Sequence, residues 1–307
     1  MSVPLDPEPL ACARIAIVGA GAVGTALARR LHDSGYGIAA VISRDPARAA
    51  HLAAGVGAAS GTSVADVPAD VDAVFCCVPD DALPAVDQAL ALSRPSWTNA
   101  LVAHTSGALP ASALRHAASA GAAVLSFHPV QTFPPGTSPD VFAGIYVGIE
   151  GDPKAVAAAE SMARRIGAHP LRIDPADKPA YHLACSLAAN YLTTVLHVAG
   201  EALAPLGLDA GEAQQVLAPL VESAVRNARS LTPARALTGP LVRGDAGTLD
   251  VHLQALADIA PARIPLYLEL AAETLRMSVD ANRVPAEKAK SVAALLDAWR
   301  RRLRDAG

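Results

Sequence analysis

The chain contains only four cysteines in 307 residues: Cys12, Cys76, Cys77 and Cys185. They form no C-x-x-C pair and no spacing with histidine that is typical of metal ligands. A scaffold held together by disulfides and a metal site are therefore not expected. The thiols are predicted to be reduced, as in a cytoplasmic protein.

Positive charge is also scarce and scattered. The formal net charge is -4 at pH 7, and the one basic cluster lies close to the C-terminus at Arg300, Arg301, Arg302 and Arg304. A protein that binds nucleic acid is expected to carry a basic patch, so this class is not favoured. The terminal cluster suits the C-terminal end of a helix, where it complements the helix dipole.

The first twelve residues lack the pattern of a targeting sequence. Residues 1–12 read MSVPLDPEPLAC, which is acidic and interrupted by proline. We therefore expect neither a secretory signal nor a transit peptide, but a short disordered arm.

The first half of the chain contains a regular alternation of strand-like and helix-like segments. Near-continuous apolar runs separated by helix-length segments are typical of a parallel sheet with helices on both faces. The strand-like runs begin near residues 14, 37, 71, 99, 122, 144 and 171. We predict an α/β fold that begins with a Rossmann dinucleotide-binding domain over residues 1–174.

Strand signals stop near residue 174, and the rest of the chain is predicted to be helical. The expected helices span residues 177–206, 209–229, 245–259, 262–282 and 285–304. The chain length also fits two domains, each large enough for its own core. We predict an all-helical second domain over residues 175–307 that serves in substrate binding and dimerisation.

A glycine-rich turn, GAGAVG, follows the first predicted strand and opens a helix. Glycines at such a turn permit a sharp bend, close approach of a pyrophosphate and tight packing of the helix on the strand. The predicted cofactor-binding residues of this turn are Gly19, Gly21, Ala22, Val23 and Gly24. The alternative is a glycine-rich turn without a ligand.

The residues after the second strand favour NADP over NAD. An NAD enzyme usually offers an acidic side chain to the ribose hydroxyls, whereas this chain has Ser43 and Arg44. A hydroxyl and a guanidinium suit a 2′-phosphate. Asp45 comes next, but Pro46 follows it, so we expect this carboxylate to cap a helix. A solvated Arg44 and NAD as cofactor are the alternatives.

Polar residues follow several predicted strands, where ligands bind in open α/β sheets. Those with a predicted cofactor contact are Val78, Pro79 and Thr105, and those with a predicted role toward the substrate are Ser106, His128 and Gln131. Each also has a structural explanation. Hydroxyls satisfy turn amides, and a single histidine is more often a hydrogen-bonded structural residue.

The segment 179–200, PAYHLACSLAANYLTTVLHVAG, contains no Asp, Glu, Lys or Arg. At about 100° per residue, its polar side chains fall on one stripe of a helix. They are His182, Ser186, Asn190, Thr193 and His197. The remaining circumference is largely apolar, so we expect a mostly buried helix whose polar stripe faces a polar cavity.

Other interpretations of this segment stay open at the level of sequence. It is long enough to span a membrane, although its polar side chains would be costly in lipid. Ser186 and Thr193 could bond back to helix carbonyls, with His197 at an interface. Its apolar surface also fits packing against a second subunit in a homodimer.

A polar loop, LTGPLVRGDAGTLDVHL, spans residues 237–253. Arg243 is a candidate anchor for a substrate carboxylate, and His252 is expected to project from the following helix. The structural alternative pairs Arg243 with Asp245, or makes Asp245 an N-cap.

Together these motifs resemble the Rossmann-like NADP oxidoreductase family that carries a C-terminal domain of unknown function. The motifs are GAGAVG, the SR after the second strand, HTSGAL, FHPVQTF, LTGPLVRGD, and the spaced Lys178, Tyr181, His182 and Asn190. The resemblance covers about residues 14–300. The family is similar in architecture to 3-hydroxyisobutyrate dehydrogenases, 6-phosphogluconate dehydrogenase and pyrroline-5-carboxylate reductases.

One position departs from these relatives. In the hydroxyacid dehydrogenases a catalytic lysine lies four residues before an asparagine, but the residue four before Asn190 is Ser186. This departure argues against hydroxyacid chemistry and moves the expected proton donor to His182 or His128.

The sequence thus predicts an NADPH-dependent oxidoreductase that reduces a small carbonyl or imine compound in the cleft between its domains. The predicted catalytic residues are His182, Asn190, Ser106 and His128, and the predicted substrate-binding residues are Ser106, Gln131, Ser186 and Arg243. A non-catalytic NADP(H)-binding regulatory or sensor protein is the alternative function, and a reduced deazaflavin is an alternative cofactor. Neither a membrane nor a nucleic-acid partner is expected.

Overall fold

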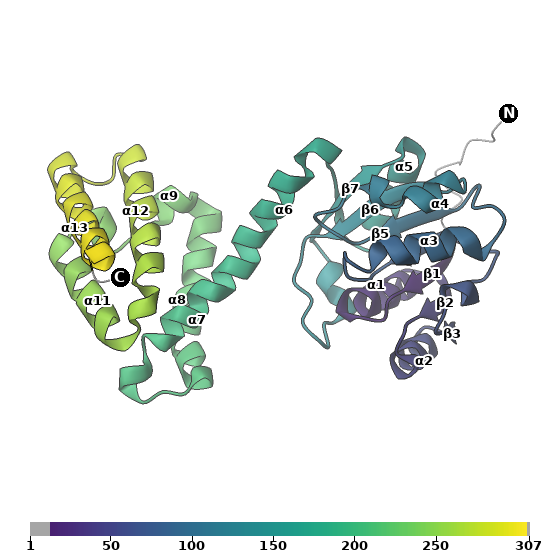
Figure 1. Ribbon diagram of the computed structural model, residues 1–307, viewed down its shortest axis with the longest axis horizontal. Helices are drawn as coiled ribbons and strands as arrows, with labels where there is room; N and C mark the ends of the chain where they lie inside the picture. The colour runs from purple at the N-terminus through teal and green to yellow at the C-terminus, as the bar shows by residue number, and fades with distance from the viewer. Residues whose placement is uncertain (1–12, 306–307) are drawn as a thin grey trace. The chain divides into compact units, whose positions relative to one another are not determined.

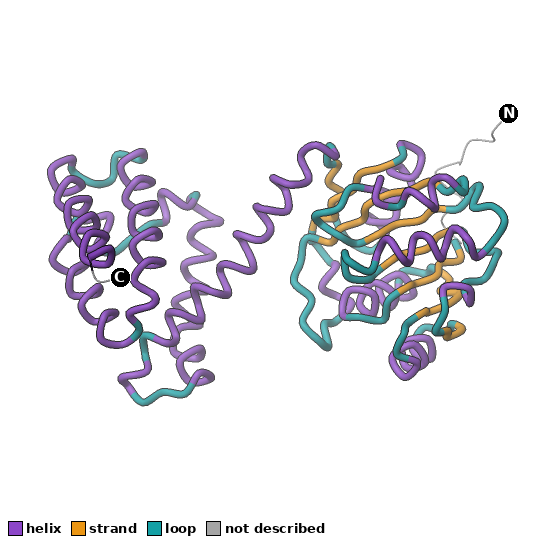
Figure 2. The backbone as a smooth tube through the Cα atoms, viewed as in Figure 1, coloured by secondary structure: helices purple, strands orange, loops and turns teal. Residues whose placement is uncertain are grey.

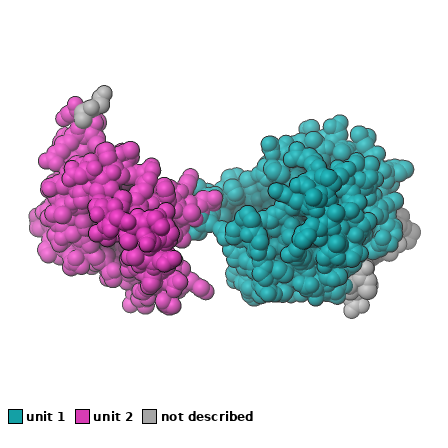
Figure 3. All heavy atoms as spheres, turned by 90° about the horizontal axis from the view of Figure 1, so that it is seen from below, with its two compact units in different colours: residues 1–189 teal, residues 190–307 magenta. Residues whose placement is uncertain are grey.

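The computed structural model describes residues 13–305, so the predicted disordered arm at residues 1–12 lies outside the described residues. The chain divides into two compact units, Met1–Ala189 and Asn190–Gly307, drawn in teal and magenta in Figure 3. They are called unit 1 and unit 2 below.

Unit 1 is built on one sheet of eight strands in the order β3-β2-β1-β4-β5-β6-β7-β8 (Figures 1 and 2). The strands are β1 (Arg14–Val18), β2 (Gly37–Ile42), β3 (Ala59–Gly61), β4 (Ala73–Cys76), β5 (Leu101–His104), β6 (Ala123–Pro129), β7 (Tyr146–Gly151) and β8 (His169–Arg172). Neighbouring strands are parallel except β6 and β7. The order reverses between β1 and β4, which creates the switch point where such sheets bind ligands.

Helices cover both faces of this sheet, because its inner strands are apolar on both sides. They are α1 (Ala22–Asp33), α2 (Pro46–Gly55), α3 (Leu83–Ser93), α4 (Arg115–Ser119) and α5 (Pro153–Arg165). On one face, Leu27 of α1 and Met162 of α5 share a buried cluster with Phe127. On the other face, Leu90 of α3 shares a buried cluster with Val74.

The predicted fold class is confirmed, and three local features differ from the prediction. The short edge strand β3 and the helix α5 were not predicted. Strand β7 runs antiparallel to β6, although the sheet was predicted to be parallel. The reversal follows from the connection, because β6 and β7 are joined by an irregular segment with a short 3-10 helix, η4 (Pro139–Phe142). A parallel pair would need a full crossover.

Unit 1 ends within a long helix that has an irregular middle. This helix runs as α6 (Lys178–Ser186), a π-helical segment η6 (Leu187–Tyr191) and α7 (Leu192–Glu201). The sheet stops at Arg172, close to the predicted boundary at residue 174. Unit 1 nevertheless extends to Ala189, because α6 packs on the sheet.

The prediction that this helix is mostly buried is wrong for the single chain. Leu183, Leu187 and Tyr191 expose 56%, 53% and 56% of their surface. By length and composition Pro175–Glu201 could cross a membrane, but one helix of this kind is weak support for a span.

The predicted polar stripe along the whole segment is also wrong. A π-helical turn holds one more residue than an α-helical turn, so side chains after it are rotated by about 100° from the expected direction. Thr193 and His197, which follow the π-helical segment, therefore do not continue the line of His182 and Ser186.

Unit 2 is helical, as predicted. After α7 it contains α8 (Ala210–Leu231), α9 (Pro233–Ala236), α10 (Pro240–Arg243), α11 (Ala246–Ile259), α12 (Ile264–Asp280) and α13 (Ala286–Asp305). Short 3-10 helices complete the chain: η2 (Val64–Asp66), η3 (Ala111–Ala113), η5 (Pro175–Asp177), η7 (Ala204–Leu206) and η8 (Pro261–Arg263). The core of unit 2 lies between α11, α12 and α13, around Leu253, Leu268 and Trp299.

Candidate functional site

The glycine turn between β1 and α1 is tightly packed at two glycines and open at the third. A Cβ on Gly19, whose φ is +109°, would lie 2.2 Å from the Cys77 carbonyl oxygen. A Cβ on Gly24 would lie 1.9 Å from the Gly19 carbonyl oxygen, whereas one on Gly21 would meet nothing within 4 Å. Gly21 is the N-cap of α1 and has no side chain to satisfy the first amides. The turn therefore presents a helix N-terminus to open space, an arrangement that binds phosphate groups.

A cavity of about 660 Å³ lies beside this turn, at the carboxyl ends of β1, β2 and β4. Its lining includes the predicted cofactor-binding residues Gly19, Gly21, Ser43, Arg44, Val78 and Pro79. The other predicted residues of this group are Ala22, Val23 and Gly24 in the adjacent first turn of α1, and Thr105 directly after β5. The cavity is also lined by Arg48 and Thr62, which were not predicted.

Asp45 caps helix α2, as its position before Pro46 predicts. Its carboxylate accepts hydrogen bonds from the amides of Ala47 at 3.0 Å and Arg48 at 3.1 Å. The Arg48 guanidinium lies 3.2 Å from the same carboxylate. The acid is thus engaged within its own helix, and Arg44, Asp45 and Arg48 all line the cavity. The only signal for Arg48 in the sequence is its place one turn after the cap.

His104 ends β5 and is engaged on both ring nitrogens. Nδ1 accepts a hydrogen bond from the Ser106 amide at 3.2 Å, which leaves Nε2 to donate to the Pro110 carbonyl oxygen at 3.1 Å. The side chain is 1% exposed, and burial lowers its pKa to about 4. His104 is therefore neutral at pH 7 and serves to hold the following turn.

The Ser106 hydroxyl organises the same turn. Its Oγ donates to Asp80 Oδ2 at 2.9 Å and accepts from the amides of Ala108 at 3.2 Å and Leu109 at 3.0 Å. It thereby satisfies the turn amides and connects the loop after β4 with the loop after β5. A contact of Ser106 with substrate stays a prediction.

Two imidazoles meet at Gly107. A Cβ on Gly107 would lie 2.8 Å from His128 Nε2 and 2.8 Å from His182 Cδ2, and the two ring centroids are 6.4 Å apart. The Tyr181 hydroxyl lies 2.6 Å from His128 Nδ1. The structure thus brings His128 at the end of β6 together with Tyr181 and His182 of α6, next to the turn after β5.

The protonation of this group follows from its burial. Burial lowers the pKa of His128 to about 4, with smaller contributions from Lys178 and His182. His128 is therefore neutral at pH 7 and acts through hydrogen bonds rather than as a charged acid. Burial raises the pKa of the Tyr181 hydroxyl, so the phenol stays protonated.

A buried lysine lies next to these side chains. Lys178, the first residue of α6, is 1% exposed, and its Nζ donates to Ser126 Oγ at 2.7 Å. Nζ also lies 3.9 Å from Glu150 Oε1, and Glu150 accepts a hydrogen bond from the Ala111 amide. Burial lowers the pKa of Lys178 and raises that of Glu150. No role was predicted for Lys178, because a lysine at the start of a helix normally indicates an exposed position.

The remaining predicted substrate residues are spread over both units. Gln131 is exposed, and its side-chain oxygen accepts from the Thr132 amide at 2.8 Å. Ser186 lies one turn after His182 in α6, in unit 1, whereas Asn190 and Arg243 belong to unit 2.

In the loop before α11, Asp245 is an N-cap, which was one of the two structural alternatives for this loop. Asp245 caps α11 by accepting from the Thr248 amide at 3.0 Å and from the Thr248 hydroxyl at 2.6 Å. The carboxylate is therefore used within its own helix, and Arg243 ends the short helix α10 just before it.

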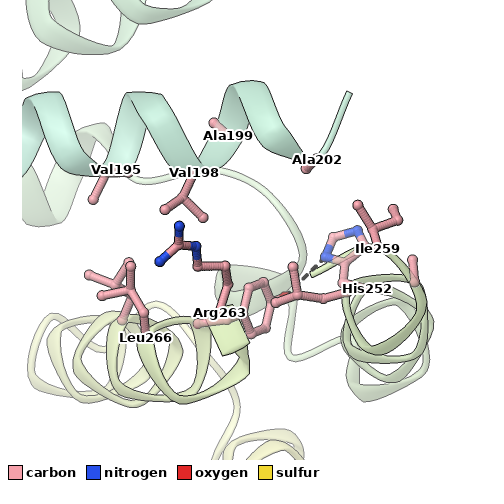
Figure 4. A pocket seen from close by; sticks show the side chains of 12 residues that line it. Val195, Val198, Ala199, Ala202, His252, Ile259, Arg263 and Leu266 are labelled. Atoms are coloured by element: carbon pink, nitrogen blue, oxygen red, sulfur yellow. Dashed lines mark hydrogen bonds between the residues drawn. The ribbon is translucent and has the colours of Figure 1, made fainter. Parts of the chain in front are cut away.

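A second cavity, of about 350 Å³, lies within unit 2 and is lined by residues of α7, α11 and α12 (Figure 4). Its walls are mainly apolar, with side chains such as Val195, Val198 and Leu266. His252 lines it and lies 3.0 Å from the Tyr267 hydroxyl. This cavity was not predicted, because its walls come from three separate helices.

Two family models match successive parts of the chain. Residues 14–106 match the family described as NADP oxidoreductase, coenzyme F420-dependent. Residues 145–274 match a domain of unknown function, DUF2520. No curated protein matches the chain.

Several solved structures are similar over most of the chain. A Bacteroides fragilis protein described as an NADP oxidoreductase is 28% identical, with a TM-score of 0.75 over 87% of this chain and 99% of its own. A reductive aminase from Aspergillus terreus, solved with NADPH and ethyl levulinate, is 20% identical, with a TM-score of 0.63 over 92% and 99% of the two chains. An imine reductase from Pseudomonas sp. is 20% identical, with a TM-score of 0.61 over 92% and 99%. The last two share the fold.

These matches confirm the resemblance predicted from the motifs. The NADP class of cofactor, predicted from Ser43 and Arg44, agrees with the family description. The chain is thus similar to the coenzyme F420-dependent NADP oxidoreductase family over residues 14–106 and to DUF2520 over residues 145–274.

Proposed function

We propose that the protein is an NADPH-dependent reductase that acts on a small carbonyl or imine compound. The NADP oxidoreductase domain and the likeness to an imine reductase and a reductive aminase support this function. The observation that carries it is the placement of two imidazoles at Gly107, on the same sheet edge as a cavity that combines the open Gly21 turn with Arg44.

The cavity fits the charged parts of NADPH. The pyrophosphate would be held by the amides at the start of α1 beside Gly21, where no side chain intervenes. The 2′-phosphate would be bound by Ser43 and Arg44, with Arg48 and Thr62 in the same cavity. When bound, NADPH supplies the hydride.

The chain's own side chains supply and direct the proton. An imidazole exchanges protons near neutral pH, so His182 is the proposed general acid toward the alkoxide or amine that develops on the substrate. When the Tyr181 hydroxyl donates a hydrogen bond to His128 Nδ1, the neutral ring carries its proton on Nε2. Nε2 is also an atom of this ring that faces Gly107. His128 then offers the substrate a neutral hydrogen-bond donor.

The other predicted residues keep their roles as proposals. Asn190 and Ser106 would orient the substrate, Gln131 and Ser186 would line its pocket, and Arg243 would hold an acidic group if the substrate carries one.

The test separates binding from turnover. NADPH affinity is measured by fluorescence titration, and NADPH oxidation is followed by absorbance with a panel of ketones, aldehydes and imines. His182→Ala is expected to abolish oxidation and to leave NADPH affinity unchanged. His197→Ala, at an exposed histidine of α7, is the matched control and should retain activity.

Two outcomes would contradict the proposal. Tight NADPH binding with no oxidation by any compound in the panel would favour the non-catalytic sensor. Absence of NADPH affinity would remove NADPH as the cofactor, and the same titration with a reduced deazaflavin would then identify the alternative.

We further propose a cytoplasmic homodimer. Leu183 and Leu187 of the long helix and Val216 and Leu220 of α8 are exposed in the single chain. Within each helix the two side chains are four residues apart and so lie on one face, and contiguous exposed apolar surface marks interaction sites. Light scattering after size exclusion is expected to give the mass of a dimer, and a monomeric wild-type protein would contradict the proposal.

A further inference from the structure

Three polar side chains form a row across unit 1. In the register of the sheet, Ser126 of β6 is paired with His104 of β5 on one side and with Glu150 of β7 on the other. Paired residues of adjacent strands point to the same face of a sheet. All three side chains are buried, so the row crosses the interior of the unit.

The ammonium group of Lys178 contacts the middle residue of this row, Ser126. Nζ donates to Ser126 Oγ at 2.7 Å, and Ser126 Oγ donates to the Ser106 carbonyl oxygen at 3.2 Å. A chain of hydrogen bonds therefore leads from the start of α6, through β6, to the turn that contains Ser106 and Gly107. A buried ion pair such as Lys178 and Glu150 contributes little net stability compared with apolar residues of the same volume, so stability alone does not account for it.

The same lysine begins helix α6. Tyr181 and His182 follow Lys178 by three and four residues, so the three side chains lie on one face of the helix. Tyr181 reaches His128, and His182 reaches Gly107. Lys178 is therefore connected to the imidazoles by two routes, along the helix and through the turn.

We propose that Lys178 is a positioning residue that fixes the Gly107 turn and the start of α6. It thereby places His128 and His182, the two imidazoles of the proposed site. The kinetic consequence rests on the proposed reductase function, whereas the placement itself is a property of the free protein.

The pKa of His128 depends on the charges around it, so it can be measured as a test of the proposal without enzymatic turnover. The groups that act on it are Lys178, His182 and Tyr181 from α6, Asp80 after β4 and His104 at the end of β5. The ammonium of Lys178 disfavours a second positive charge, which contributes to the lowered pKa of His128.

The first experiment titrates His128 by NMR in the free protein. In Lys178→Met, which keeps the chain length without the charge, the His128 pKa is expected to rise from about 4 toward its ordinary value. Lys154→Met, at an exposed lysine of α5, is the control and should leave it unchanged. An unchanged His128 pKa in Lys178→Met would overturn the proposal. If that variant does not fold, Lys178→Met combined with Glu150→Gln removes both charges and is titrated in its place.

The second experiment breaks the connection and leaves the ion pair intact. Ser126→Ala is expected to lower kcat about tenfold, the effect of one hydrogen bond, with the Kd for NADPH unchanged. Ser126→Thr keeps the hydroxyl and should restore kcat. Equal losses in both variants, or an effect confined to the NADPH Kd, would overturn the positioning role. If the wild-type protein oxidises no NADPH, the reductase function fails, and the NMR titration still decides the role of Lys178.

Discussion

Replacing Arg44 by alanine is expected to weaken NADPH binding about tenfold and to leave NADH binding unchanged. Arg44 lines the cavity beside Ser43 and is exposed. A hydrogen bond to a charged group contributes about 1.5–3 kcal/mol, which corresponds to roughly 10- to 150-fold in Kd. Solvent screening at an exposed side chain places the expected effect at the lower end of this range.

Arg48 provides a graded comparison for this prediction. Its guanidinium lies 3.2 Å from the Asp45 carboxylate, so its charge is already partly neutralised. Arg48→Ala is therefore expected to weaken NADPH binding by less than Arg44→Ala.

Fluorescence titration of both cofactors at low and at physiological salt checks these expectations. The effect of Arg44→Ala should shrink as salt rises. Equal weakening of NADPH and NADH, or no weakening of either, would refute the assignment of Arg44 to the 2′-phosphate.

Further predictions follow from the same structure. Gly21→Val should fold normally and lose NADPH affinity, because its side chain enters open space at the phosphate site, whereas Gly24→Val should lower the melting temperature, because its Cβ would lie 1.9 Å from a carbonyl oxygen. Gly107→Ala should lower kcat with little change in the NADPH Kd, since its Cβ would lie 2.8 Å from two imidazoles. His104 has a pKa of about 4 in the folded protein against an ordinary value of 6.5, so between these two pH values the unfolded chain binds a proton that the folded chain does not. Its contribution to the free energy of unfolding should be complete above pH 6.5 and decrease by about 3 kcal/mol as the pH falls toward 4, and His104→Asn should reduce this dependence in urea denaturation. Leu187→Glu should convert a dimer to monomers in light scattering, because it places a charge in an exposed apolar surface.

The parts of the fold that were predicted from the sequence are those set by local chemistry. Gly19 and Gly24 have packing that only glycine allows, and the turn they form lies where the strand pattern ends. Asp45 before Pro46 caps its helix because these residue types favour that position. Such signals depend on neighbours in the chain, so the sequence contains them.

The features that were missed depend on contacts between distant segments. The direction of β7 is set by the path of the chain after β6 and not by its own residues. Lys178 is buried because Ser126 and Glu150, on two other segments, receive its ammonium. Neither partner is close to Lys178 in sequence, so spacing within one helix could not identify the pair.

The prediction of a continuous polar stripe was wrong for a different reason. Its residues were projected with one constant angle per residue, and a π-helical segment at Leu187–Tyr191 breaks that constancy. His182 and His128 were both predicted as site residues, and the structure places them close together at Gly107, with His182 in the regular helix before the interruption.

The mainly apolar cavity of unit 2 has a practical consequence for crystallography. A mainly apolar cavity of about 350 Å³, with walls such as Val195 and Leu266, is a candidate site for xenon under gas pressure. Crystals treated in this way would gain an anomalous scatterer at a known place in the helical unit, which would supply experimental phases without chemical labelling of a thiol.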